Sequence, residues 1–257
     1  MATIEDFHTK TVPTDYGNLC TWFSGRRLPD DAEFVLVHGL IVSSSFMKPT
    51  AKYLAQNHRV YVPDLMGHGI SDTPERPLTI AEHAKTLAST LENLKIKKPI
   101  IVGGSYGCHV SVELANLMDV EALVFVGPTP GGSFREAFSE LTIDASREPL
   151  QLVFNVISEI FRIGPARVIE LLGDMARYPF HERLRAIKAP TLIITGEHDP
   201  FFDASFMDRT AEELECTHSL CMPNVAHGLP FTEPKIISDF IEQFVGRLRE
   251  ERSAAAA

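Results

Sequence analysis

The sequence is poor in cysteine and has no long hydrophobic run. Only 4 of its 257 residues are cysteines, and none forms a CxxC pair, which excludes a disulfide scaffold and favours free thiols in a reducing compartment. The apolar runs are about strand length, well short of the roughly 18 residues that a membrane-spanning helix needs. The N-terminus lacks a basic stretch followed by an apolar run, so we expect no signal peptide. These absences predict a soluble, cytoplasmic protein with no membrane partner.

Basic residues are also scarce. The chain has 24 Lys and Arg and 34 Asp and Glu, which gives a formal net charge of −10. This charge argues against a nucleic-acid partner, since phosphate binding needs basic patches. No His, Cys, Asp or Glu residues have metal-ligand spacing, and no GxGxxG pattern follows a predicted strand, so we expect no metal and no organic cofactor. The expected partner is a small-molecule substrate. The oligomeric state stays open between monomer and dimer.

What the sequence does contain is a series of short β-rich runs that alternate with helical patterns. Continuous Val, Ile and Leu runs between helices indicate a parallel sheet that is covered on both faces. The stretches 7–12 and 19–24 suggest an added hairpin at one edge. Strands are predicted at residues 34–37, 59–62, 99–102, 122–126, 191–195 and 217–222.

One interval, residues 129–183, breaks the alternation because it contains helical patterns but no convincing strand. It is too long for a normal crossover, although ordinary connecting helices on the face of the sheet are the alternative. We therefore predict an α/β core of residues 1–128 and 184–251 with a helical cap of residues 129–183. Residues 252–257 are expected to be a disordered tail or a cloning remnant.

A G-x-S-x-G pattern at residues 103–107 places Ser105 between a predicted strand and a predicted helix. A serine on such a sharp turn points its oxygen clear of the sheet, and the helix N-terminus adds oriented N–H groups. The alternative is a glycine-rich turn or a phosphate loop. The strand-to-helix context favours Ser105 as a nucleophile.

A serine nucleophile needs a base, and the base needs an acid that orients it. Among the ten histidines, His227 lies in a loop between the last predicted strand and the C-terminal helix, whereas His109 would lie one turn along the helix, behind the nucleophile. Asp199 lies deep in the loop that directly follows a predicted strand, and the proline after it restrains it. Glu197 and Asp203 are its rivals.

The chain order of Ser105, Asp199 and His227 is the order of the α/β-hydrolases, and the sequence resembles that superfamily over nearly its whole length apart from the tail. Residues 37–40 look like the family's HG motif, and residues 63–72 look like its D-x-x-G-x-G-x-S-D segment. The resemblance implies the α/β-hydrolase fold, a mostly parallel eight-stranded sheet flanked by helices with a helical cap insertion.

The resemblance also implies roles for individual residues. The backbone N–H groups of Leu40 and Tyr106 correspond to the family's oxyanion hole. His68 and the acids near it correspond to structural residues that hold their loop by local hydrogen bonds. Relatives with dehalogenase or epoxide-hydrolase chemistry carry Asp at the position of Ser105, so both chemistries are disfavoured here.

Three functions remain open, because fold and triad do not fix the substrate. The first is a serine hydrolase that cleaves a carboxylic ester, lactone or thioester of a small to medium, largely apolar substrate through an acyl-enzyme. The second is a carbon–carbon bond hydrolase or cofactor-free lyase that uses the same triad. The third is a hormone-type ligand receptor on the same fold.

The insertion supplies side chains that could roof the cleft above the nucleophile. An apolar roof favours uncharged or aromatic acyl groups, while an inward-turned arginine could pair with a carboxylate substrate. The apolar candidates are Phe134, Phe138, Phe154 and Met175. The arginines to consider are Arg135, Arg147, Arg162, Arg167 and Arg177.

Overall fold

The computed structural model describes residues 7–25, 33–129, 148–201, 204–214 and 217–255. They contain an eight-stranded sheet in the order β1-β2-β4-β3-β5-β6-β7-β8. β1 is antiparallel to β2 and β2 to β4, whereas all other neighbours are parallel. The predicted mostly parallel sheet and its edge hairpin are therefore confirmed. The strands are β1 (His8–Thr14), β2 (Gly17–Ser24), β3 (Glu33–Val37), β4 (Arg59–Pro63), β5 (Ile100–Gly104), β6 (Ala122–Val126), β7 (Thr191–Gly196) and β8 (Thr217–Met222).

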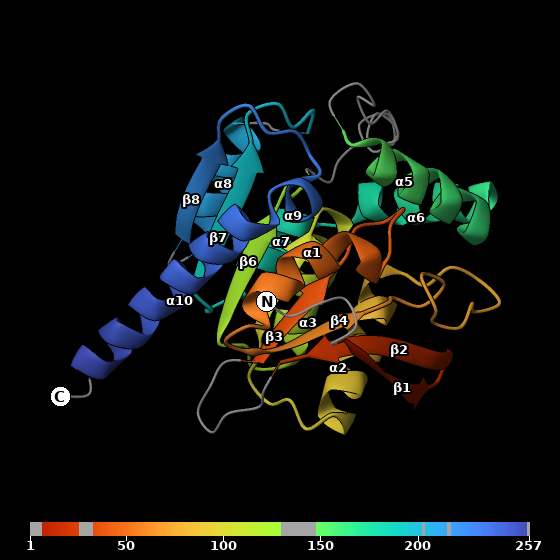
Figure 1. Cartoon of the computed structure of the whole chain (residues 1–257), viewed down its shortest axis with the longest axis horizontal. Coiled ribbons are helices and arrows are strands. Elements are labelled where there is room, and N and C mark those ends of the chain that lie inside the picture. The colour runs from red at the N-terminus through yellow and green to blue at the C-terminus, as the bar shows by residue number, and fades with distance from the viewer. Residues whose placement is uncertain (1–6, 26–32, 130–147, 202–203, 215–216, 256–257) are drawn as a thin grey trace.

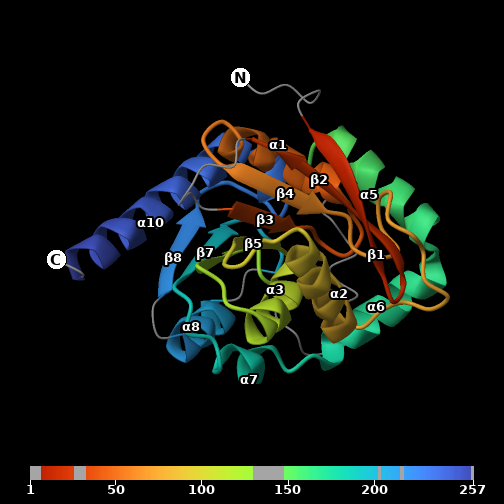
Figure 2. The same cartoon turned by 90° about the horizontal axis from the view of Figure 1, so that it is seen from below.

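Helices cover both faces of the sheet, as its continuous apolar strands require. Helices α1 and α10 lie on one side of the sheet, and α2, α3 and α8 lie on the other (Figure 2). Helices α5 and α6 pack against each other beyond these layers (Figure 1). The helices are α1 (Ser44–Leu54), α2 (Ile80–Asn93), α3 (Tyr106–Leu117), α5 (Leu150–Ile163), α6 (Pro165–Arg177), α7 (Phe180–Leu184), α8 (Ala204–Glu213), α9 (Leu229–Thr232) and α10 (Pro234–Ala255).

The predicted insertion and the end of the chain need separate comment. From residue 148 to β7 the described chain is helical, with α5, α6 and α7 and no strand, while residues 130–147 lie outside the described residues. Residues 252–255, which were expected to belong to a disordered tail or a cloning remnant, continue α10. Alanine is the strongest helix former, and Arg252 extends the packing of this helix by bonding Glu121 at 3.1 Å.

Candidate active site

Ser105 stands on a strained turn between β5 and α3. Its backbone angles are φ 52° and ψ −119°, a conformation that residues other than glycine rarely adopt. The turn is tight because its glycines let other groups approach closely. A Cβ on Gly103 would lie 2.6 Å from Ser111 Oγ, and one on Gly107 would clash with the carbonyl oxygen of Val37. This geometry brings Ser105 to the wall of the main pocket.

His227 and Asp199 meet beside that pocket in the loops after β8 and β7. Nδ1 of His227 lies 2.8 Å from Oδ2 of Asp199, and Oδ1 of Asp199 accepts a hydrogen bond from the N–H of Phe201 at 2.9 Å. Asp199 is buried, whereas His227 is partly exposed. Because a carboxylate only accepts, Nδ1 carries the proton and Nε2 is left as the basic nitrogen.

Of the other candidates for the acid and the base, the structure describes Glu197 and His109. Oε2 of Glu197 accepts a hydrogen bond from the N–H of Asn224 at 3.0 Å, so Glu197 supports the histidine loop rather than the histidine ring. His109 is fully buried in α3, where neither ring nitrogen has a hydrogen-bond partner among the described residues. Asp203 lies outside the described residues.

The loop after β3 carries Leu40, whose N–H the resemblance assigns to the oxyanion hole. Nδ1 of His38 lies 2.7 Å from the carbonyl oxygen of Gly39, and Nε2 of His38 accepts a hydrogen bond from the N–H of Leu65 at 3.0 Å. These two contacts fix the tautomer, since Nε2 must accept and Nδ1 must donate. His38 is fully buried, which lowers its pKa and keeps this ring neutral. A Cβ on Gly39 would lie 3.4 Å from Cβ of Ser105, so this loop borders the nucleophile.

A second buried histidine supports the same loop. Nε2 of His68 donates a hydrogen bond to the carbonyl oxygen of Leu40. Oδ1 of Asp64 accepts from the N–H of Ser44 at 2.7 Å, and Oδ2 of Asp64 accepts from the N–H of Ile70 at 3.2 Å. The segment of residues 63–72 therefore contacts the loop that carries Leu40 and does not line the pocket.

The pocket itself is a largely apolar chamber of about 810 Å³, its open mouth included. Its polar side chains are Ser105, His198, His227 and Glu148. Its larger apolar side chains include Leu40, Phe46, Leu152, Val156, Leu172 and Phe201.

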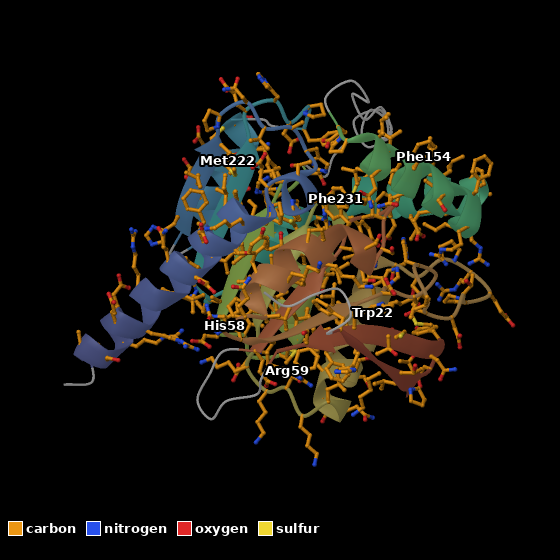
Figure 3. The ribbon with its side chains drawn as sticks, in the orientation of Figure 1. Trp22, His58, Arg59, Phe154, Met222 and Phe231 are labelled. Carbon is orange, nitrogen blue, oxygen red and sulfur yellow. The ribbon has the colours of Figure 1, made fainter. Side chains whose placement is uncertain are left out.

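The structure does not bring the two described substrate-binding candidates to this pocket. Phe154 is 69% exposed on α5, where Figure 3 labels it, and Met175 is 1% exposed in the core, with Sδ 3.9 Å from Oγ1 of Thr129. Neither residue lines the pocket. Helix α5 carries large apolar side chains on both its buried and its exposed face, so hydrophobicity alone does not select the face that meets the pocket. Leu152 and Val156 line the pocket from α5 instead. Phe134 and Phe138 lie outside the described residues.

The described arginines of the insertion also point elsewhere. Arg162 donates to the carbonyl oxygen of Gly67 at 2.9 Å, and Arg167 donates to that of Pro74 at 2.9 Å. Neither they nor Arg177 lines the pocket. Arg135 and Arg147 lie outside the described residues. The ionisable pocket residues that the sequence analysis missed are Glu148 and His198. Glu148 gives no pattern of its own in the sequence.

Two absences characterise the described part of the chain. It contains no group of three His, Cys, Asp or Glu side chains that could hold a metal ion. None of the helices it includes is both long and apolar enough to cross a membrane.

Comparison with known proteins relates this site to a family. A model of the alpha/beta hydrolase family matches residues 34–240. Monoacylglycerol lipase ABHD6 of Mus musculus is 25% identical over 270 residues, which cover 88% of this chain and 80% of the relative. A thermophilic esterase from Thermogutta terrifontis superposes with a TM-score of 0.80 at 20% identity, covering 94% of this chain and 99% of that one. Est816, an N-acyl homoserine lactone degrading enzyme, superposes with a TM-score of 0.77 at 20% identity, with coverage of 91% and 100%. The chain therefore belongs to the α/β-hydrolase family and is an esterase-like hydrolase.

Proposed function

We propose that the protein is a serine esterase in which Ser105 is the nucleophile, His227 the general base and Asp199 the residue that orients the base. The observation that carries this proposal is the 2.8 Å contact between His227 Nδ1 and Asp199 Oδ2, made in the loops beside the pocket that Ser105 lines. A hydroxyl needs an adjacent, oriented base to become a nucleophile. Ser105 and His227 both line the pocket, and the contact with Asp199 orients the ring of His227.

The reaction proceeds in two halves on the same residues. Oγ of Ser105 attacks the acyl carbonyl carbon while Nε2 of His227 takes the hydroxyl proton. The N–H groups of Leu40 and Tyr106 stabilise the negative oxygen that forms, and one such donor is typically worth about 10²–10³ in rate. His227 then gives its proton to the leaving alcohol, which departs and leaves an acyl-enzyme. Water attacks that ester with the help of His227, releasing the acid and restoring Ser105.

The pocket supports an acyl group that is small to medium in size and largely apolar. Its walls are mostly apolar, and burying each CH₂ of a ligand there is worth about 0.8 kcal/mol. None of the described arginines lines the pocket to bind a carboxylate-bearing acyl group. The names of the relatives span a monoacylglycerol lipase, an esterase and a lactone-degrading enzyme. We therefore assign the substrate class to carboxylic esters, with thioesters and lactones as chemically equivalent acyl donors.

The test is hydrolysis of p-nitrophenyl butanoate by the purified protein and by Ser105→Ala. We expect the variant to lose at least about 10³-fold in kcat, since a triad acts as a unit. The matched control is Ser253→Ala, which removes a hydroxyl from the exposed face of α10. A fluorophosphonate probe followed by mass spectrometry should mark Ser105. A folded Ser105→Ala protein that keeps the wild-type rate would refute the assignment, and saturable ligand binding without turnover would favour a receptor.

A further inference from the structure

One carboxylate joins the start of α5 to the loop of the proposed base. Glu148 precedes α5, is only 8% exposed and belongs to the pocket wall that also includes Ser105 and His227. Its Oε1 accepts a hydrogen bond from the N–H of Gly228 at 2.9 Å. Because Gly228 directly follows His227, this bond restrains the peptide unit through which the chain leaves the histidine.

The fit between this carboxylate and the glycine is close. A Cβ on Gly228 would lie 2.5 Å from Oε2 of Glu148 and 2.7 Å from Cδ2 of Leu152. The φ of Gly228 is −72°, which any residue can adopt, so space rather than backbone conformation favours glycine there. The carboxylate of Glu148 is therefore packed directly against the backbone beside His227.

The loop after β7 supplies further contacts to the loop of His227. The N–H of His198 donates a hydrogen bond to the carbonyl oxygen of Val225 at 2.9 Å. At the ring itself, Nδ1 of His227 lies 2.8 Å from Oδ2 of Asp199. These contacts hold the histidine ring and the chain before it, whereas Glu148 holds the chain after it.

Restraint on both sides of His227 determines where its Nε2 lies. The contact with Asp199 anchors the ring at Nδ1, and the ring can still pivot about that point if its backbone moves. The bond from Glu148 restrains this backbone, because the N–H of Gly228 belongs to a planar unit that includes the carbonyl carbon of His227. His227 is partly exposed, so packing alone does not immobilise it. A misplacement of about 1 Å between reacting groups can cost about 10²-fold in rate.

We propose that Glu148 is a positioning residue for the reaction: by accepting the N–H of Gly228, it holds His227 in the orientation from which Nε2 reaches Ser105. The inference rests on the proposed esterase function and names a further residue on which that site depends. Burying a charge among largely apolar walls is costly unless it is hydrogen-bonded, and the bond to Gly228 offsets part of that cost. A carboxylate also binds a backbone N–H more strongly than a neutral acceptor does.

The experiment compares Glu148→Leu, which removes the acceptor, with Glu148→Gln, which keeps an acceptor oxygen but carries no charge. Hydrolysis of p-nitrophenyl butanoate gives kcat and KM for both variants and for the wild-type protein. We expect Glu148→Leu to lower kcat about tenfold or more with KM changed less than about twofold, because His227 acts in both halves of the reaction. Glu148→Gln should stay within about threefold of the wild-type kcat.

The matched control is Glu170→Leu, which removes an equal charge from the exposed face of α6 and should leave both constants unchanged. A wild-type kcat in a folded Glu148→Leu protein would overturn the proposal. A rise in KM at constant kcat would also overturn it, because Glu148 would then act only as part of the substrate-binding wall. So would an equal loss of kcat in Glu148→Leu and Glu148→Gln, since Gln keeps the acceptor. Hydrolysis that survives Ser105→Ala would instead refute the proposed esterase function.

A second measurement follows the histidine itself and does not depend on turnover. The proton between Nδ1 of His227 and Asp199 should give a downfield proton NMR resonance that Asp199→Ala removes. We expect this resonance to shift or broaden in Glu148→Leu but not in Glu148→Gln or Glu170→Leu. Gly228→Ala, whose Cβ would displace the carboxylate, should have the same effect and provides the test if Glu148→Leu does not fold. An unchanged resonance in folded Gly228→Ala or Glu148→Leu protein would overturn the proposal.

Discussion

His38 holds the peptide unit of Gly39 through a 2.7 Å contact between its Nδ1 and the Gly39 carbonyl oxygen. The N–H at the other end of this peptide belongs to Leu40, so the ring of His38 fixes the direction in which that N–H points. The proposed oxyanion donor is therefore oriented by a side chain that does not itself line the pocket.

Replacing this ring should weaken catalysis more than substrate binding. We expect His38→Ala to lower kcat by about 10–100-fold with little change in KM. A misdirected N–H would lose part of the rate enhancement of about 10²–10³ that one oxyanion donor supplies. Steady-state kinetics on a neutral ester would measure both constants, with His8→Ala on the exposed edge strand as the control. A rise in KM alone would contradict this role of His38.

The strained backbone of Ser105 should lower the stability of the fold. Ser105→Gly removes the Cβ that disfavours φ 52°, so the free energy of unfolding should rise by about 1 kcal/mol or more, although activity is lost. Ser105→Ala is the matched control, since it removes the hydroxyl but keeps the Cβ. Urea unfolding of the three proteins would test this, and equal stability of the two variants would count against stored strain.

Two glycines should respond to alanine in opposite directions. Gly107→Ala places a Cβ against the carbonyl oxygens of Val37 and His38, so it should destabilise the protein by a few kcal/mol and abolish turnover. Gly246→Ala lies in α10 with open space around the new Cβ and should stabilise by about 0.5–1 kcal/mol. Thermal unfolding of the two variants and the wild-type protein measures the sign of each change in stability. An unchanged stability of Gly107→Ala would show that the turn between β5 and α3 has room for a Cβ at this position.

Buried histidines should make the protein sensitive to acid. Burial lowers the pKa of His68 to about 4 and that of His109 to about 3, and it also lowers the pKa of His83. An unfolded chain takes up protons on these rings near pH 6.5, whereas the same rings in the folded protein stay neutral until a lower pH. Their stabilising contribution is therefore complete above about pH 6.5 and is lost progressively as the pH falls toward 4.

His109 offers a direct test of this effect. Its ring packs 4.9 Å from that of Phe180, and neither of its nitrogens has a hydrogen-bond partner among the described residues. We expect His109→Phe to retain stability at pH 7.5 and to reduce the loss of unfolding free energy between pH 6.5 and 4. Urea titrations at several pH values measure the slope of the free energy of unfolding against pH. An unchanged slope would show that His109 does not titrate with unfolding.

The sheet and the candidate triad could be predicted from the sequence because local patterns encode them. Buried parallel strands are continuous apolar runs, and a Ser, Asp or His placed just after such a run must lie at one edge of the sheet. The contact between His227 and Asp199 agrees with that expectation. The prediction that these residues, with Leu40 and Tyr106, perform catalysis awaits the experiments above.

The lining of the pocket could not be predicted from the sequence, for physical reasons. Helix α5 carries Leu152 and Val156 on its inner face, but large apolar residues such as Leu150 and Phe161 on its exposed face. A periodic pattern cannot choose between two apolar faces. Glu148 gives no periodic signal at all, and its partner Gly228 is distant in the sequence, so only the fold brings the two together.

The arrangement of the strands also has a consequence for folding kinetics. The loops with Ser105, Asp199 and His227 follow β5, β7 and β8. Parallel pairing joins β7 directly to β8 but joins β5 to them only through β6. Such non-local pairing is slow to form because loop-closure entropy is lost before the contacts are gained. Enzymatic activity should therefore return late during refolding, after helical circular dichroism has recovered, and so report completion of the whole sheet rather than collapse of the chain.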